Sequence, residues 1–252
     1  MFGLDPTLLA ATLALTMFGG FVKGAVGFGQ PMIMISGFAT ILPPDVALAA
    51  LIVPMVTSNA WQGLRGGFRA AWASVLRFRL YLAIVMVFIA GAAQLVRILP
   101  NWMMLLILGV PITLFSLSQL AGWGFRIAPE RRRLAEVLIG SFAGFVGGMS
   151  GVWGPPTVLY LTAIDTPKVE QIRVQGVIYG LGAVVLLLAH LKSGVLNAET
   201  APLSMALVVP GAIGMALGFA VQDRLDQRRF RQATLAVLVV VGLNLIRRGL
   251  AG

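Results

Sequence analysis

Long apolar stretches, separated by short polar breaks, run along this chain from Leu8 to Ile246. A helix needs about 20 mostly apolar residues to cross a bilayer, and most of these stretches reach that length. The pattern therefore predicts an all-α, polytopic integral membrane protein with no separate soluble domain. Hydropathy and turn-forming residues place the apolar segments at 7–26, 30–42, 46–64, 78–98, 102–122, 134–150, 153–164, 169–190, 201–222 and 230–248.

Basic residues gather in three of the polar breaks. They are Arg65, Arg69, Arg77 and Arg79; then Arg126 with Arg131 to Arg133; and then Arg224, Arg228, Arg229 and Arg231. By the positive-inside rule, all three loops are expected in the cytoplasm. The linker from Arg97 to Asn101 is then expected outside, and so are both termini. The predicted location is the inner (cytoplasmic) membrane of a bacterium.

The two halves of the chain resemble each other in sequence. The segment GFVKGAVGFGQP at 20–31 aligns with GFVGGMSGVWGP at 144–155, and Pro44 parallels Pro167. We therefore predict two structural repeats, each a glycine-broken, re-entrant-like hairpin followed by three transmembrane helices. Repeat 1 covers 1–125, with a hairpin at 7–42 and spans at 46–64, 78–98 and 102–122. Repeat 2 covers 134–252, with a hairpin at 134–164 and spans at 169–190, 201–222 and 230–248.

The loop charges also predict that the two repeats have opposite orientations. Counting back from the first basic loop places the first hairpin at the outer side, whereas the second hairpin is entered from the cytoplasm. The segment at 153–164 has about 12 residues, which is too short to cross the hydrocarbon core as a helix. A hairpin that returns to its own side fits this length, and four full spans in the second half are the alternative.

Composition narrows the class of protein further. Of the 252 residues, 58% are hydrophobic and 11% are charged, whereas about a quarter of the residues in soluble domains are charged. The net charge of +10 sits in short loops and not along one face or tail, so it indicates membrane topology and not nucleic-acid binding. The chain has no cysteine, which excludes disulfides and thiolate metal sites. No metal or cofactor is predicted.

Glycines followed by proline mark the turn of each hairpin. Gly27 and Gly29 precede Pro31 in the first, and Gly151 and Gly154 flank the turn of the second. Glycine permits non-helical backbone, and proline suits the first turn of a new helix. Half-helices starting inside the membrane direct backbone N–H groups and a positive dipole end into the break, which is a natural anion site. The alternative is close helix packing through small residues, as in Gly20-x-x-x-Gly24.

Several polar residues near the hairpins are candidates for substrate binding, because polar groups inside a membrane are costly. Arg173, near Gln175, could bind an anion through two parallel hydrogen bonds, or it could snorkel to the cytoplasmic surface. The first half offers neutral donors that could instead serve helix packing: Thr57, Ser58, Asn59 and Gln62.

Three further candidates lie in the hairpins themselves. Lys23 would attract an anion or reach an acidic partner, while Gln30 and Trp153 stand at the two breaks. Asp165 and Glu170 flank the second hairpin, where they could carry a coupling proton or be solvated loop charges.

The glycine-rich segments at 20–31 and 144–155, the Pro44/Pro167 pair and Leu64-Arg65-Gly66 resemble the TauE/SafE family of sulfite and organosulfonate exporters. The resemblance covers nearly the whole chain. Trp153 stands where a glycine would be typical, so the site is expected to be asymmetric. The resemblance implies export of a small sulfur oxyanion or a sulfonate.

Together these features predict a secondary transporter that exports sulfite, a sulfonate such as sulfoacetate, or a related anion by alternating access at the two hairpin tips. An anion channel built from re-entrant half-helices is the alternative. An enzyme is not predicted, because no H-E-x-x-H, no G-x-S-x-G and no paired intramembrane carboxylates are present. The expected partners are the anion and the lipid bilayer; a coupling proton or cation and a homodimer stay open, and no nucleic acid is expected.

Overall fold

The computed structural model describes residues 5–38, 40–92, 101–123, 126–150 and 154–251. Within these ranges all regular secondary structure is helical, which confirms the predicted all-α class. The chain divides into two compact units, and each unit combines two separate stretches of sequence. Unit 1 consists of Met1–Ala71 and Ile172–Asp226, and unit 2 consists of Trp72–Gln171 and Gln227–Gly252.

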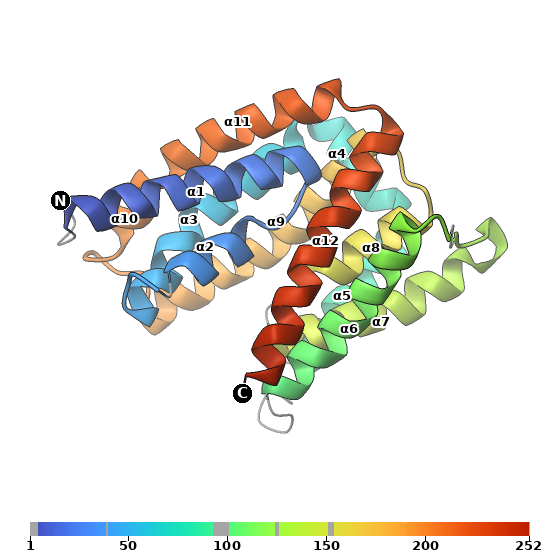
Figure 1. Cartoon of the computed structure of the whole chain (residues 1–252), viewed down its shortest axis with the longest axis horizontal. Coiled ribbons are helices and arrows are strands. Elements are labelled where there is room, and N and C mark those ends of the chain that lie inside the picture. The colour runs from blue at the N-terminus through green and yellow to red at the C-terminus, as the bar shows by residue number, and fades with distance from the viewer. Residues whose placement is uncertain (1–4, 39, 93–100, 124–125, 151–153, 252) are drawn as a thin grey trace. The chain divides into compact units, whose positions relative to one another are not determined.

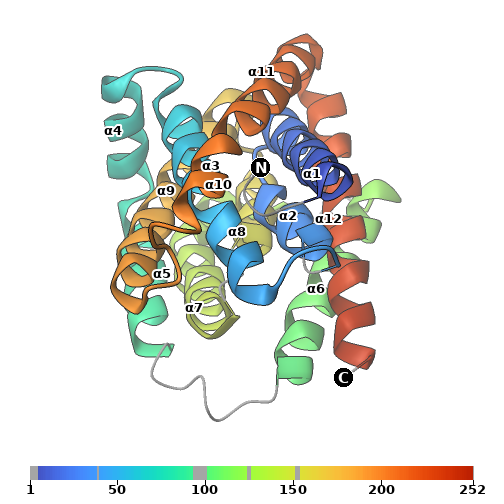
Figure 2. The ribbon, with the colours of Figure 1, turned by 90° about the vertical axis from the view of Figure 1, so that its left-hand side faces the viewer.

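Unit 1 is organised around two long helices that lie side by side, α1 and α11 (Figures 1 and 2). A Cβ added at Gly20 of α1 would lie only 2.3 Å from the carbonyl oxygen of Gly211, and one added at Gly24 only 2.3 Å from that of Met215. Small residues thus let the two backbones touch, as is common between membrane helices. The helices of this unit are α1 (Pro6–Val26), α2 (Gln30–Phe38), α3 (Pro44–Leu64), α9 (Lys168–Ser193, from Ile172 onward), α10 (Ala201–Ala206) and α11 (Val208–Arg224).

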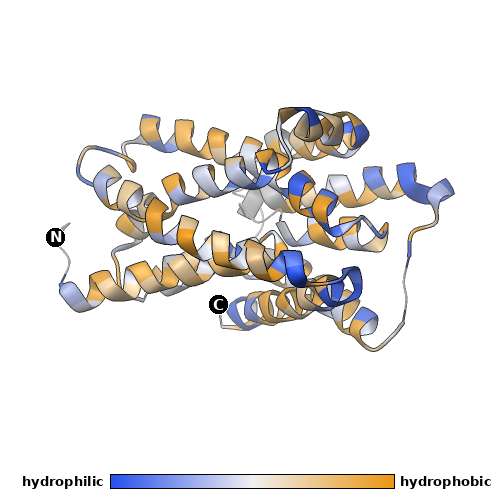
Figure 3. Ribbon diagram, turned by 90° about the horizontal axis from the view of Figure 1, so that it is seen from above, coloured by the Kyte–Doolittle hydropathy of each residue, from blue (hydrophilic) through white to orange (hydrophobic). Residues whose placement is uncertain are grey.

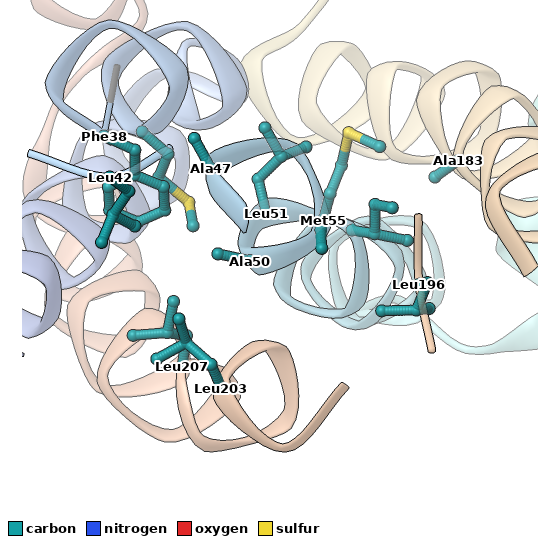
Figure 4. Packing of buried hydrophobic residues seen from close by; sticks show 13 residues of the cluster. Phe38, Leu42, Ala47, Ala50, Leu51, Met55, Ala183, Leu196, Leu203 and Leu207 are labelled. Atoms are coloured by element: carbon teal, nitrogen blue, oxygen red, sulfur yellow. The ribbon is translucent and has the colours of Figure 1, made fainter. Parts of the chain in front are cut away.

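An apolar cluster fills the part of unit 1 where α2 meets α3 and α10 (Figure 4). Phe38 and Leu42 come from the end of α2 and the turn after it, Leu51 from α3, and Leu203 and Leu207 from α10 and the residue that follows it. All five side chains are buried. The cluster anchors the short helix α2, so its first residue is held at a defined place beside the end of α1.

Unit 2 contains two helix pairs, α6 with α12 and α5 with α7 (Figures 1 and 2). Glycines again permit the close approach: a Cβ added at Gly109 of α6 would lie 2.9 Å from the Gly242 carbonyl oxygen of α12, and one at Gly144 of α7 would lie 2.6 Å from that of Val85 of α5. The elements of this unit are α4 (Phe68–Arg77, from Trp72 onward), α5 (Arg79–Ala92), α6 (Asn101–Leu120), the 3-10 helix η2 (Pro129–Arg131), α7 (Arg132–Ser150), α8 (Gly154–Ala163) and α12 (Gln227–Leu250).

Five stretches of helix in the described chain are long and apolar enough to cross a membrane, and the bent pair α4–α5 would make six if it is one span. Figure 3 shows hydrophobic residues along most of the length of the helices and hydrophilic residues at several helix ends. The predicted multi-pass architecture is confirmed at this level. The five stretches are Pro6–Val26, Val46–Leu64, Lys168–Lys192, Ala201–Arg224 and Gln227–Leu250.

The two hairpins each have one long and one short arm. Helix α1 has 21 residues, whereas α2 has nine and α8 has ten. At about 1.5 Å per residue, α2 extends about 14 Å, less than half of a hydrocarbon core of about 30 Å. The short arms therefore cannot cross a membrane by themselves, as predicted for the segment at 153–164.

One helix was not predicted. The stretch around Arg69 and Arg77 was interpreted as a basic loop, but it forms the amphipathic helix α4, which bends by 77° into α5 at Phe78. Its apolar residues Phe68 and Trp72 are exposed and lie one turn apart. A search for 20-residue apolar spans cannot detect a ten-residue helix with an arginine near each end, because its mean hydropathy is low.

Candidate substrate site

The first hairpin is interrupted between α1 and α2, as predicted. Gly27 and Gly29 have φ angles of 91° and 94°, which lie in the left-handed region that glycine enters readily. The Gly27 N–H donates to the Lys23 carbonyl oxygen over 2.6 Å and closes the last turn of α1. Helix α2 then begins at Gln30. The break is thus a defined, fully buried turn and not a continuation of one helix.

Gln62 of α3 binds this turn directly. Its Nε2 group donates to the Gly27 carbonyl oxygen over 2.9 Å and to the Ile172 carbonyl oxygen over 2.7 Å. The side chain is completely buried. One amide therefore satisfies a free carbonyl at the break and also holds the beginning of α9 within unit 1, leaving its own oxygen without a hydrogen-bond partner among the described residues.

Lys23 lies in the last turn of α1 and is 1% exposed. Its Nζ donates a short hydrogen bond to Oδ1 of Asn59 on α3. Its ammonium group also lies 5.8 Å from the centre of the Tyr179 ring on α9, a distance at which a cation is attracted by an aromatic face. Two helices of unit 1, α3 and α9, thus contribute neutral groups around the buried lysine of α1.

Two further amides border the break. A Cβ added at Gly27 would lie 2.0 Å from Oε1 of Gln175, so this carboxamide rests against the turn. The Gln30 side chain lies against Gly19 of α1 and Gly211 of α11, at 3.4 Å from Cβ positions built on either one. Both glutamines are completely buried, and their amide nitrogens and oxygens have no hydrogen-bond partner within the described chain.

We call Lys23, Gln30, Asn59, Gln62 and Gln175 the amide cluster. A carboxamide offers two N–H donors and one oxygen acceptor, and a buried polar group left without a partner costs about 1–3 kcal/mol. The cluster thus combines one lysine with amide N–H groups, those of Gln30 and Gln175, that no other described residue binds. Such a set can bind the oxygens of a small anion.

Two predicted candidates take other positions. Ser58 is buried but donates to the Met55 carbonyl oxygen of its own helix over 3.1 Å. Arg173 is half-buried, and its Nη1 lies 3.1 Å from a Cβ position built on Gly66, just beyond the end of α3. The structure therefore associates Arg173 with the end of α3 near Arg65, where Arg65 pairs with Asp223.

The second hairpin shows a related construction within unit 2. Helix α8 begins at Gly154, and Pro155 and Pro156 occupy its first turn, where their missing N–H groups are not needed. Gly151 and Trp153, which were predicted to contribute to the site, lie outside the described residues.

A buried polar network occupies unit 2 beside this hairpin. The carboxylate of Glu136 on α7 accepts from the Tyr160 hydroxyl over 2.8 Å and from Nε of Arg132 over 3.0 Å. Tyr160 of α8 stacks on Tyr81 of α5, with ring centres 4.7 Å apart, and the Tyr81 hydroxyl donates to Thr157 over 3.0 Å. In contrast to the amide cluster, this network pairs its charge internally.

The acidic residues at the end of the second hairpin also have partners. Asp165, with φ 55°, lies 3.2 Å from Arg231 and 3.6 Å from Arg126, and Glu170 lies 2.6 Å from Arg77. These pairs are partly solvent-exposed. Their geometry is that of charges at the surface of unit 2 and offers no buried proton site.

Some residues of these networks were not selected from the sequence. Tyr179 lies four residues after Gln175, so helical spacing would have placed it on the face of a chosen candidate. Glu136 lies four residues after Arg132, a spacing that allows an ion pair on one helix. Arg131 to Arg133 were interpreted only as a signal for the cytoplasmic side, so the ion pair of Arg132 with Glu136 was not predicted.

Membrane-length apolar helices together with a buried cation and buried amides at a helix break are features of polytopic membrane transport proteins. Comparison with protein families agrees: the model of the sulfite exporter TauE/SafE family matches residues 12–245. The chain belongs to this family, which consists of membrane transporters and not enzymes. Searches among curated proteins and among solved structures gave no match.

Proposed function

We propose that this transporter exports a small sulfur oxyanion or sulfonate, and that the amide cluster of unit 1 binds it. The single observation that carries the proposal is the arrangement around Gly27, where the buried Lys23 ammonium accompanies glutamine amides whose N–H groups have no partner among the described residues. A sulfonate or sulfite group has three oxygens around one sulfur. A cation and several N–H donors suit those oxygens in charge and number.

We further propose that the site alternates between the two sides of the membrane through two inverted repeats. The contacts inside each unit support a repeat. Helix α1 packs on α11 in unit 1, and α7 packs on α5 in unit 2. In the predicted alignment of the two repeats, α1 corresponds to α7, and α5 corresponds to α10–α11. The two contacts are therefore equivalent, and both are made at aligned residues, Gly20 and Gly144.

The compact units are not the predicted repeats, because each unit takes helices from both halves of the sequence. An exchange of this kind is expected where two homologous halves pack through equivalent faces. The orientation of the repeats, the outside location of both termini, the bacterial inner membrane and the homodimer stay predictions. So do the contributions of Gly151, Trp153, Gly154 and Arg173 to the site.

Transport by the purified full chain in proteoliposomes tests the function. We expect sulfite and ethanesulfonate to move faster than into empty vesicles, and Gln175→Leu to reduce the rate on the order of tenfold, because one hydrogen bond to a charged group contributes about 1.5–3 kcal/mol. Thr234→Val is the control, since Thr234 is also buried, with no partner for its hydroxyl in the described chain, but lies on α12 in unit 2.

Two results would contradict the proposal. Equal rates for Gln175→Leu and Thr234→Val would remove the amide cluster from the substrate path, whereas the absence of flux for every sulfur anion would reject the substrate class. Discrete single-channel currents would favour the anion channel instead.

A further inference from the structure

Two charged side chains are buried in the described chain, Lys23 and Glu136, and they differ in how their charge is compensated. Glu136 accepts a hydrogen bond from a guanidinium group, Arg132. Among the described residues, the Lys23 side chain donates to the neutral amide oxygen of Asn59 and has no ion-pair partner. An ammonium group away from water is strongly destabilised unless an opposite charge lies close to it. The charged form of Lys23 therefore requires an anion.

The described residues of unit 1 provide no carboxylate for this purpose. The titratable or charged groups that its packed helices bring to this region are Arg65 just after α3, Arg173 and Tyr179 on α9, and Asp223 and Arg224 on α11. Tyr179 faces the ammonium group with its ring. Asp223 is paired with Arg65. Helix α2 contributes the neutral amide of Gln30.

On the basis of the proposed function, we infer that Lys23 carries one proton together with each transported anion. Loading converts a neutral amine, one proton from the adjacent solution and one monoanion into an ammonium–anion pair. Release on the other side returns the proton and the anion and restores the amine. No bond other than the N–H bond forms or breaks.

Charge balance explains why the two events are coupled. The loaded site holds one positive and one negative charge, and the empty site holds neither, so both states have zero net charge. An empty site with an ammonium group, or a loaded site with an amine, would hold one bare buried charge and is disfavoured. Only these two states of zero net charge can move the site from one side of the membrane to the other at low cost. Transport is therefore electroneutral, with one proton per anion.

This coupling has consequences for substrate and direction. One cation compensates a monoanion, so the site selects sulfonates and hydrogen sulfite over the sulfite and sulfate dianions. Because proton and anion move together, external acid drives the anion inward. Net export then runs when the anion accumulates inside the cell strongly enough to exceed the opposing proton gradient.

The coupling is tested with the full chain in proteoliposomes that contain a pH-sensitive dye, using ethanesulfonate because its sulfonate group stays ionised. We expect external acid to drive uptake, the lumen to acidify by one proton per anion, and a potassium–valinomycin potential to leave the rate unchanged. Sulfonate flux that responds to the potential and carries no proton would overturn the inference and leave the proposed function intact. Absence of any sulfur-anion flux would instead reject the proposed function.

Lys23→Arg separates a proton carrier from a merely structural cation, because a guanidinium group binds anions but is not deprotonated in proteins. For the native chain, we expect the apparent Kd for ethanesulfonate, from thermal shifts, to rise about tenfold per pH unit wherever binding takes up one proton. Lys23→Arg should show a flat profile and lose acid-driven uptake.

The same pH profile in both proteins would overturn the inference. The native proton-to-anion ratio remains decisive if Lys23→Arg does not fold.

Discussion

The two units of this transporter each bury one ionisable side chain among their described residues, and these two side chains have different kinds of partner. In unit 1, Lys23 contacts the neutral amide of Asn59 and the aromatic ring of Tyr179. In unit 2, Glu136 accepts hydrogen bonds from Arg132 and Tyr160. Glu136 is paired with a charged group of the protein, whereas the ammonium form of Lys23 has no counterion among the described residues. The contrast separates a structural network from a candidate substrate site.

The largest expected effect comes from removing the cation of unit 1. Lys23→Met keeps the length of the side chain but eliminates its charge, so we expect sulfonate transport to fall on the order of 100-fold, which corresponds to about 2–3 kcal/mol. The Tm of the ligand-free protein should stay equal or rise, because methionine replaces the buried polar amine of the empty site with apolar atoms. Flux assays and thermal unfolding of the same preparation measure both quantities. A large loss of Tm with flux per folded molecule unchanged would make Lys23 structural.

The turn at the site gives the next effect. Gly27→Ala should destabilise the protein by about 2–4 kcal/mol, because its φ is positive and the new Cβ would collide with Gln175. Gly67→Ala is the matched control: Gly67 has φ 84°, but no atom lies within 4 Å of a Cβ added there. It should cost only about 1 kcal/mol. Denaturation curves of the two variants test this difference, and equal losses would show that the contact with Gln175 contributes nothing.

The smallest of these effects is expected in the paired network of unit 2. Tyr160→Phe removes the hydroxyl that donates to Glu136 and should lower stability by about 1–2 kcal/mol, because the carboxylate loses one donor but keeps Arg132. The affinity for ethanesulfonate should change less than twofold. Thermal shifts with and without the anion measure both. A tenfold loss of affinity at unchanged stability would assign this network to the substrate site.

Much of the secondary structure could be predicted from the sequence. The segments at 7–26 and 230–248 correspond to α1 and α12 within three residues at either end. Hydropathy over 20 residues predicts such helices because the bilayer imposes their length. Helix α4 was missed, since a short amphipathic helix leaves no signal on that scale.

The candidate site was predictable only in outline. The glycine break was expected, because few other residues adopt positive φ at a buried turn, and Lys23, Gln30, Asn59 and Gln175 were selected as polar residues in apolar segments. Ser58, chosen for the same reason, donates instead to its own helix. Polarity alone cannot distinguish these outcomes, because it does not reveal which side chain a neighbouring helix reaches.

Local sequence thus determined the helices, the glycine-broken turn and the family of this transporter, because each depends on a continuous stretch of chain. The tertiary structure decided which groups meet. Gln62 hydrogen-bonds both to Gly27 and to Ile172, which lies 110 positions after Gln62 in the sequence. Gln175 rests against the same turn at Gly27. Buried polar groups must find partners wherever helix packing places them, so packing determined that Glu136 meets Arg132 and that Lys23 meets Asn59.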